Sequence, residues 1–380
     1  MNFNGQDGAV ESNNLKTGTS RKFTMLKSNL SLLVAFAILA AATSTTMAQT
    51  PSSGAGIDDS KSPKVGNGAT PDFITVSQKQ PVSEQPSFTQ GESQSDVVTL
   101  FEWTGANPRT AKIAKIKSTD GRQWTVPART HFQFAPKAFD LYNEANKVTP
   151  AGLADVDVNQ IPVIDAGGDE VFTAYVFGDN YFEFYVNGKL LAVDPVPMTP
   201  FNSNVIRFKA QRPVTIGVMG VDWEERLGLG FEQFRGAPFH QGDAGLVAVI
   251  KNAAGETVSI TDEPWKAQTF YVAPLKSPDC LVVDGSHRDS SKCSTEDVED
   301  GTTWFAAHWP IPQNWAAADF KDHHWPNAVT FTNDFVGVNN KPAYTNFTDL
   351  FDAPDADAKF IWSSSLVHDN LVLMRTTIGK

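Results

Sequence analysis

Few cysteines and few basic residues mark this 380-residue sequence, and each shortage argues against a class of function. There are two cysteines, with neither a Cys-x-x-Cys pair nor a His-Glu-x-x-His motif, which argues against the common zinc and dithiol sites. Lysine and arginine together number 31 against 43 acidic residues, so the formal net charge is −12. Nucleic acids bind basic surfaces, and DNA or RNA is therefore not an expected partner.

The familiar catalytic signatures are also missing. No Gly-x-Ser-x-Gly elbow presents a serine nucleophile, and the glycine-rich stretch LGLGFEQFRG lacks the Gly-Lys-Ser/Thr ending of a phosphate-binding loop. The sequence therefore favours a binding or structural module over an enzyme, while catalysis by acidic residues stays open as an alternative.

Long apolar runs are scarce, and the one present lies near the N-terminus. Leu30–Ala42 is a 13-residue run without charge, preceded by Lys22 and Lys27 and followed by Ala48. A membrane-spanning helix needs about 20 apolar residues. We therefore predict a secretory signal over residues 1–48, with Met25 as an alternative start, and a secreted (extracellular or periplasmic) mature chain without a membrane span.

Export affects both the charge and the cysteines. Residues 1–48 contain four basic and two acidic residues, so the mature charge moves from −12 to about −14, which is compatible with Ca²⁺. Cys280 and Cys293 lie 13 positions apart, and in an exported chain they are expected to form a disulfide. Closing that loop would stabilise the fold by roughly 3 kcal/mol on the chain-entropy model.

Composition divides the rest of the chain into two parts. Residues 49–97 are rich in Ser, Gln, Gly and Pro, which predicts a disordered linker. Residues 98–380 carry many short runs of Val, Ile, Phe and Tyr separated by Gly, Pro and Asn, which predicts an all-β jelly-roll or β-sandwich with long loops. The length allows a small subdomain around 276–345. Pro136–Asn146 is the best candidate for a helix or turn.

The clearest strand pattern is YFEFYV, Tyr181–Val186. Phe184 and its alternate neighbours should face one side and Glu183 the other, since side chains alternate across a strand. Asn187-Gly188 follows directly and predicts a type I′ hairpin turn.

Five segments occur in the order found in one family of β-sandwich modules. They are Asp179–Lys189 (DNYFEFYVNGK), Thr261–Lys266 (TDEPWK), Trp315–Trp325 (WAAADFKDHHW), Lys359–Trp362 (KFIW) and Asn370–Ile378 (NLVLMRTTI). Together they resemble the galactose-binding-like jelly-roll modules found beside secreted glycoside hydrolases, over roughly residues 165–380. The resemblance implies weak carbohydrate binding or packing against another domain, often with structural Ca²⁺. The loop Val193–Asn204 and the insert Cys280–Gly301 depart from the family pattern.

Two acidic segments are candidate sites. Asp222-Trp223-Glu224, with His240 in the following loop, combines carboxylates that accept hydroxyl hydrogen bonds with a ring that stacks on sugars. The same acids could catalyse glycoside hydrolysis if they face each other. Asp349, Asp352 and Asp355 could hold Ca²⁺, although their spacing is not that of an EF-hand.

The leading interpretation is a secreted non-catalytic module that binds a glycan or packs into an extracellular or cell-envelope assembly with a protein partner. The alternatives are a polysaccharide-acting hydrolase and a purely structural envelope protein.

Overall fold

The computed structural model describes residues 85–379, apart from 104–107, 199–200, 234–237, 297–299 and 355. These residues belong to one compact unit, Asn67–Lys380. Of this part, 47% is in strands and 7% in helices, which confirms the all-β class. The predicted signal and most of the predicted linker lie outside the described residues. Within the described part, no helix is long and apolar enough to cross a membrane.

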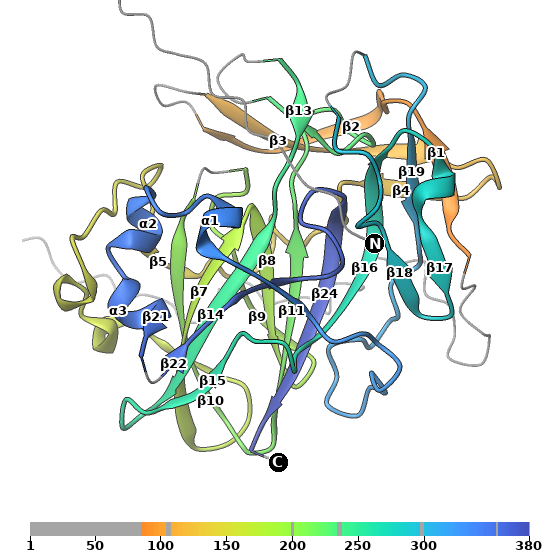
Figure 1. Ribbon diagram of the computed structural model, residues 1–380. Coiled ribbons are helices and arrows are strands. Elements are labelled where there is room, and N and C mark those ends of the chain that lie inside the picture. Colours follow the sequence, from red (N-terminus) through yellow and green to blue (C-terminus); the bar gives the residue numbers. More distant parts are fainter. Residues whose placement is uncertain are drawn as a thin grey trace, which may run out of the picture. The chain divides into compact units, whose positions relative to one another are not determined.

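Two antiparallel sheets form the sandwich (Figure 1). The seven-stranded sheet has the order β1 (Ser87–Gln90), β19 (Phe305–His308), β16 (Lys266–Leu275), β24 (Asp369–Ile378), β11 (Val214–Val221), β8 (Tyr181–Val186) and β9 (Lys189–Val193). The eight-stranded sheet has the order β20 (Val329–Phe331), β23 (Phe360–Trp362), β14 (Gly245–Asn252), β7 (Glu170–Asp179), β10 (Ser203–Ala210) and β5 (Phe139–Tyr142), with β15 (Thr257–Ile260) on β14 and β6 (Val163–Asp165), parallel, on β10.

Smaller elements complete the described part of the unit. A three-stranded sheet consists of β2 (Ser95–Trp103), β3 (Arg109–Lys117) and β4 (Gln123–Val126). The two-stranded pairs are β12 (Phe231–Glu232) with β13 (His240–Gln241), β17 (Val282–Asp284) with β18 (His287–Asp289), and β21 (Asp352–Ala353) with β22 (Ala356–Asp357). The helices are α1 (Asn333–Val336), α2 (Pro342–Thr345) and α3 (Thr348–Phe351), and the 3₁₀ turns are η2 (Leu153–Asp155), η3 (Val158–Gln160) and η4 (Pro278–Cys280).

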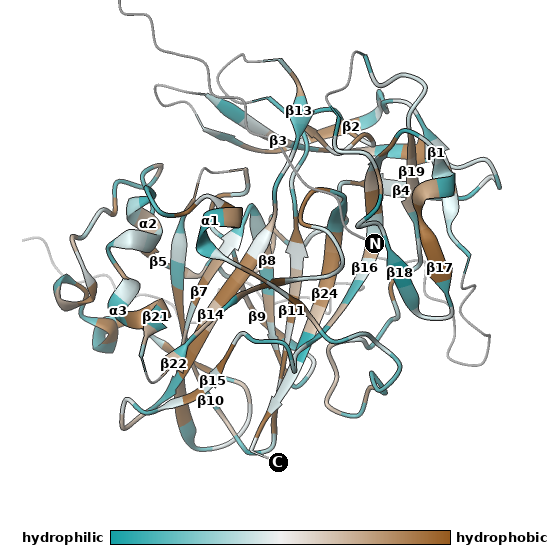
Figure 2. Cartoon of the chain, in the orientation of Figure 1, coloured by the Kyte–Doolittle hydropathy of each residue, from teal (hydrophilic) through white to brown (hydrophobic). Residues whose placement is uncertain are grey.

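The main core lies between the two large sheets. Phe184 of β8 and Phe208 of β10 are both fully buried, with ring centroids 6.1 Å apart. Phe182 and Val186, on the same face of β8 as Phe184, belong to the same cluster. The predicted inward face of this strand is therefore confirmed. Figure 2 shows apolar residues along the strands of both sheets and polar residues mainly in the connecting loops.

The seven-stranded sheet is buried on its other face as well. Tyr181 and Tyr185 of β8 and Leu373 of β24 pack there with Ala114 of β3 and Trp124 of β4. The opposite face of β8 therefore meets a second layer rather than solvent. A sheet covered on both faces explains why β8 and β11 are entirely buried.

The hairpin turn falls at the predicted residues. β8 and β9 pair antiparallel on either side of Asn187 and Gly188. Asn187 has φ 49° and Gly188 has φ 85°, the positive values that a type I′ turn needs.

Three expectations about local organisation require correction. The segment 136–146 contains the strand β5, because its backbone pairs with β10, and the predicted turn is confined to its end, from Glu144. Within the expected linker, Ser87–Gln90 forms β1 at a sheet edge, where pairing with β19 compensates for its low apolar content. Residues 276–345 do not separate as a subdomain, because β19 belongs to the seven-stranded sheet.

The disulfide between Cys280 and Cys293 is present, as predicted. It joins η4 to the segment that follows β18.

Candidate functional site

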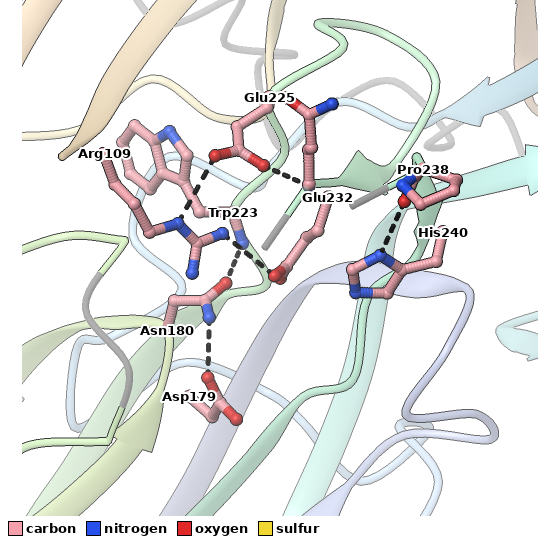
Figure 3. A network of polar contacts seen from close by, with 9 residues as sticks. Arg109, Asp179, Asn180, Trp223, Glu225, Glu232, Pro238 and His240 are labelled. Carbon is pink, nitrogen blue, oxygen red and sulfur yellow. Dashed lines mark hydrogen bonds and ion pairs between the residues drawn. The ribbon is translucent and has the colours of Figure 1, made fainter. Parts of the chain in front are cut away.

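The segment Asp222-Trp223-Glu224 follows β11, and its three side chains contact different groups. Trp223 is fully buried; its ring packs edge-on against Tyr181 at 5.6 Å, and its backbone N–H donates to Asn180 Oδ1 at 2.6 Å (Figure 3). The ring therefore has no exposed face for a sugar, contrary to the sequence-based interpretation.

Glu224 holds the glycine-rich loop in place. Its carboxylate accepts hydrogen bonds from the Gly228 N–H at 2.9 Å, from the Gly230 N–H, and from the Tyr271 hydroxyl at 3.1 Å. Burial raises the pKa of Glu224 to about 7, although these donors oppose the rise. A carboxylate with its oxygens occupied by loop and tyrosine donors fits a structural role.

Asp222 belongs to a buried acidic network at the ends of β7 and β11. Burial raises the pKa of Asp222, and the nearby carboxylates Glu232, Asp179 and Asp243 raise it further. Asp222 Oδ1 and Glu232 Oε1 are both buried without a hydrogen-bond partner. Arg109 donates to Glu225 at 3.3 Å and to Glu232 at 3.1 Å (Figure 3).

The other sequence-derived candidates are dispersed. His240 lies on β13, half-buried, with Nδ1 3.4 Å from the Pro238 carbonyl (Figure 3). Asp352 accepts hydrogen bonds from the Tyr344 hydroxyl at 2.6 Å and from Asn333 at 3.3 Å. Asp349 is exposed, and Asp355 lies outside the described residues. Among the described residues, no group of three or more His, Cys, Asp or Glu is placed to hold a metal ion.

A different set of residues forms an open pocket beside β8. Glu183 points to the outer face of β8, between Tyr181 and Tyr185 on the same strand. Its carboxylate is completely buried and accepts hydrogen bonds from both tyrosine hydroxyls, at 3.0 Å from Tyr181 and 2.6 Å from Tyr185. A carboxylate buried in this way requires such donors, because an unpaired one would cost several kcal/mol.

His131 supplies the remaining donors to Glu183. Its backbone N–H donates to Oε1 at 2.5 Å, and its Nδ1 lies 2.8 Å from Oε2. These contacts orient the imidazole, whose side chain is 25% exposed. The hydrogen bond to Glu183 raises the pKa of His131, while desolvation opposes the rise. The result is an oriented, partly exposed histidine at the pocket wall.

The pocket itself has a volume of ≈ 380 Å³ and is lined by His131, Tyr185, Leu190 and residues 311–317. We call it the His131 pocket. The Trp315 ring lies 5.1 Å from the Tyr185 ring at 69°. Arg375 of β24 fixes this wall by donating to the Trp315 carbonyl, to the Ala317 carbonyl at 3.1 Å and to Asp322 at 2.8 Å.

Comparison with known proteins adds no assignment. The chain matches no protein-family model, no curated protein and no solved structure. The resemblance to galactose-binding-like modules therefore stays a prediction.

Sequence reasoning missed the His131 pocket because its parts lie far apart in the chain. His131 and Glu183 are separated by 52 positions. One local signal was present: a Glu flanked on its own strand face by Tyr181 and Tyr185, in an otherwise apolar strand, indicates a carboxylate that is buried and paired.

Proposed function

We propose that the protein is a secreted, non-catalytic β-sandwich module that binds a glycan in the His131 pocket. The observation that carries this proposal is the combination of an aromatic wall with oriented polar side chains. Trp315 and Tyr185 are mostly buried, at 6% and 8% exposure, so the parts that reach the pocket offer a sugar apolar contact rather than a full stacking face. His131, Gln313 and Asn314 provide hydrogen-bonding groups for its hydroxyls.

The pocket is also largely formed in advance. Glu183 holds His131, and Arg375 holds the Trp315 segment, so binding would not have to order these groups. Preorganisation limits the entropy that a weak ligand must offset.

The test is calorimetric titration of the purified protein with a panel of neutral and acidic oligosaccharides. We expect saturable binding to at least one glycan and a loss of roughly 10-fold in affinity for His131→Gln, the effect of losing one hydrogen bond worth about 1.4 kcal/mol. The matched control is His287→Gln, at an exposed histidine of β18. If His131→Gln lowers the melting temperature, Gln313→Ala replaces it, because Gln313 is an exposed lining residue. No binding by the wild-type protein to any glycan would contradict the proposal.

A polysaccharide-acting hydrolase is the second candidate, because His131 at the wall of a pocket with Glu183 behind it is also an arrangement that general-base catalysis uses. Product release from the same glycans, abolished in His131→Gln and retained in His287→Gln, would favour the hydrolase. Absence of both binding and turnover would favour the structural envelope protein.

A further inference from the structure

A second pocket lies at the edge of the eight-stranded sheet, where β20, α1 and the β21–β22 pair meet. It has a volume of ≈ 530 Å³ and is lined by residues 330–334 together with Asn339, Asp352, Asp357 and Lys359. We call it the Asp352 pocket. It shares no lining residue with the His131 pocket, which lies beside β8 in the other sheet. The two pockets are therefore separate features of the fold.

An exposed aromatic ring stands beside the Asp352 pocket. Phe335 of α1 is 63% exposed, and its ring lies 5.6 Å from the ring of Phe331, which lines the pocket. The next residue, Val336, is fully buried in the main core. Successive side chains of a helix differ in direction by about 100°, so the burial of Val336 turns Phe335 away from the core. Phe335 thus offers the open ring that Trp315 and Tyr185 do not offer at the His131 pocket.

The polar lining of the Asp352 pocket is held in position by hydrogen bonds. Asp352 accepts from the Tyr344 hydroxyl at 2.6 Å and from Asn333 Nδ2 at 3.3 Å. Tyr344 itself belongs to the main core. The Thr332 hydroxyl oxygen accepts from the Phe335 N–H at 3.2 Å, which fixes the start of α1. A ligand would therefore meet groups that are already ordered.

The charges around the Asp352 pocket favour a neutral ligand. Three carboxylates line it against one ammonium group, that of Lys359, so an anionic ligand would meet net negative charge. Each carboxylate also has a partner already: Asp334 accepts from Asn339, Asp352 has the two donors given above, and Asp357 contacts Lys359. Among the described residues, no acidic group is placed to hold a metal ion. The lone pairs that remain suit hydroxyl donors.

We propose that the Asp352 pocket is a second glycan site and that its ligand is a neutral sugar. The apolar face of one sugar ring stacks on Phe335, and its hydroxyl groups form hydrogen bonds with Thr330, Asp334 and Asn339, which are exposed lining residues. This inference goes beyond the proposed function, because it does not depend on binding in the His131 pocket.

The experiment is calorimetric titration of the full chain with neutral oligosaccharides of glucose, galactose, mannose and xylose, beside uronic-acid oligomers. Phe335→Ala should weaken the binding of a neutral glycan roughly 10-fold, and Phe335→Trp should retain it, because only the second variant keeps a stacking ring. The matched control is Phe139→Ala, which removes a ring that is 48% exposed on β5, at the other end of the strand order.

Two further variants separate this site from loss of fold and from the His131 pocket. Thr330→Val removes one exposed hydroxyl from the Asp352 pocket, keeps a β-branched residue in β20 and should weaken the same glycan several-fold. It decides the matter if Phe335→Ala lowers the melting temperature. Gln313→Ala reports on the His131 pocket and should leave binding in the Asp352 pocket unchanged.

The outcomes distinguish the two glycan sites. Neutral glycans that bind Phe335→Ala and Thr330→Val as tightly as wild type would overturn the second site, whatever Gln313→Ala does. Binding that is weakened by Phe335→Ala but not by Gln313→Ala would support the second site and contradict the first. Uronic-acid oligomers that bind more tightly than neutral ones, and that depend on Phe335, would overturn the neutral ligand class. A protein that binds no glycan of either kind contradicts both proposals.

Discussion

At the scale of single residues, Glu183 shows how a partner distant in sequence changes the meaning of a strand position. From the sequence, Glu183→Ala should be mild unless its face carries a ligand. In the structure the carboxylate is fully buried and accepts hydrogen bonds from His131, Tyr181 and Tyr185. The alternation of YFEFYV predicts which face Glu183 occupies, but its partner His131 is 52 positions away, and the strand sequence does not identify that partner.

We therefore expect Glu183→Ala to destabilise the fold by about 3 kcal/mol or more, because it removes the acceptor of two buried tyrosine hydroxyls and of the backbone N–H and Nδ1 of His131. Phe184→Ala, on the opposite face, should cost about 3–5 kcal/mol through lost burial and a cavity. Urea unfolding of both variants measures the pair, and the exposed Glu256→Ala is the control. A Glu183→Ala loss below about 1 kcal/mol would contradict the burial of this carboxylate.

Asp222 carries a prediction about pH. Burial and neighbouring carboxylates raise its pKa, so the native state keeps a proton that the unfolded chain loses near pH 4. Its contribution to stability is complete below that pH and is lost as pH rises through the raised pKa. Asp222→Asn removes this loss, and its uncharged amide also removes the repulsion between residue 222 and the Glu232 carboxylate.

We expect Asp222→Asn to gain at least about 1 kcal/mol relative to wild type between pH 4 and pH 8, since one pKa unit corresponds to about 1.4 kcal/mol. Urea midpoints at the two pH values measure the gain, with exposed Asp319→Asn as control. Burial lowers the pKa of His308 to about 3, which makes stability rise with pH, opposite to the effect of Asp222. Wild type and Asp222→Asn share this contribution, so it cancels when the two are compared. If the stability gain of Asp222→Asn does not grow between pH 4 and pH 8, Asp222 is not protonated in the native wild-type protein.

At the scale of elements, the sequence predicts strands with an alternating apolar pattern better than it predicts short strands that depend on pairing with a neighbouring strand. β8 has the bounds Tyr181–Val186, the same as the alternating run that predicts it. β1 and β5 were missed because neighbouring strands determine them: β1 pairs with β19 and β5 with β10. Short polar segments acquire strand structure when an open sheet edge offers hydrogen bonds, and local composition does not report that edge.

The β8–β9 hairpin should be sensitive to Gly188. Gly188→Val places a β-branched residue at φ 85°, and its Cβ would lie 3.2 Å from Ala317 Cα. Gly285 also has positive φ, 58°, but open space around the Cβ position. We expect a loss of about 2 kcal/mol or more for Gly188→Val and a smaller one for Gly285→Val, measured by thermal unfolding. Equal losses would mean that backbone strain alone acts and that the contact with the pocket wall does not matter.

At the scale of the whole molecule, composition predicts the all-β class, and the double covering of the seven-stranded sheet emerges only from the fold. Tyr185 lines a pocket together with residues 311–317, and the Trp124 ring stacks on the His308 ring. These contacts form because segments that are far apart in the chain lie side by side in the fold. A period of two identifies two faces of a strand but does not say whether the second face meets water or another layer.

The Cys280–Cys293 disulfide is the covalent constraint on this unit. Replacing both residues by Ser should lower the free energy of unfolding by roughly 3 kcal/mol, because the unfolded chain regains the freedom of the loop. Thermal melts with and without reductant check this. Wild type should melt lower in reductant, and the double variant should melt at one temperature in both buffers. A wild-type melt that reductant does not move, with reduction confirmed by mass, would contradict the prediction.

Because the seven-stranded sheet is covered on both faces, its central strands should exchange their backbone amide hydrogens with solvent slowly. β11 lies between β24 and β8, and β24 lies between β16 and β11, with packed side chains above and below. Their amide hydrogens are shielded along the sheet and across it, so exchange with deuterium requires global opening. After long incubation in heavy water, the protium that remains should be concentrated in Val214–Val221 and Asp369–Ile378, while the edge strand Ser87–Gln90 exchanges early.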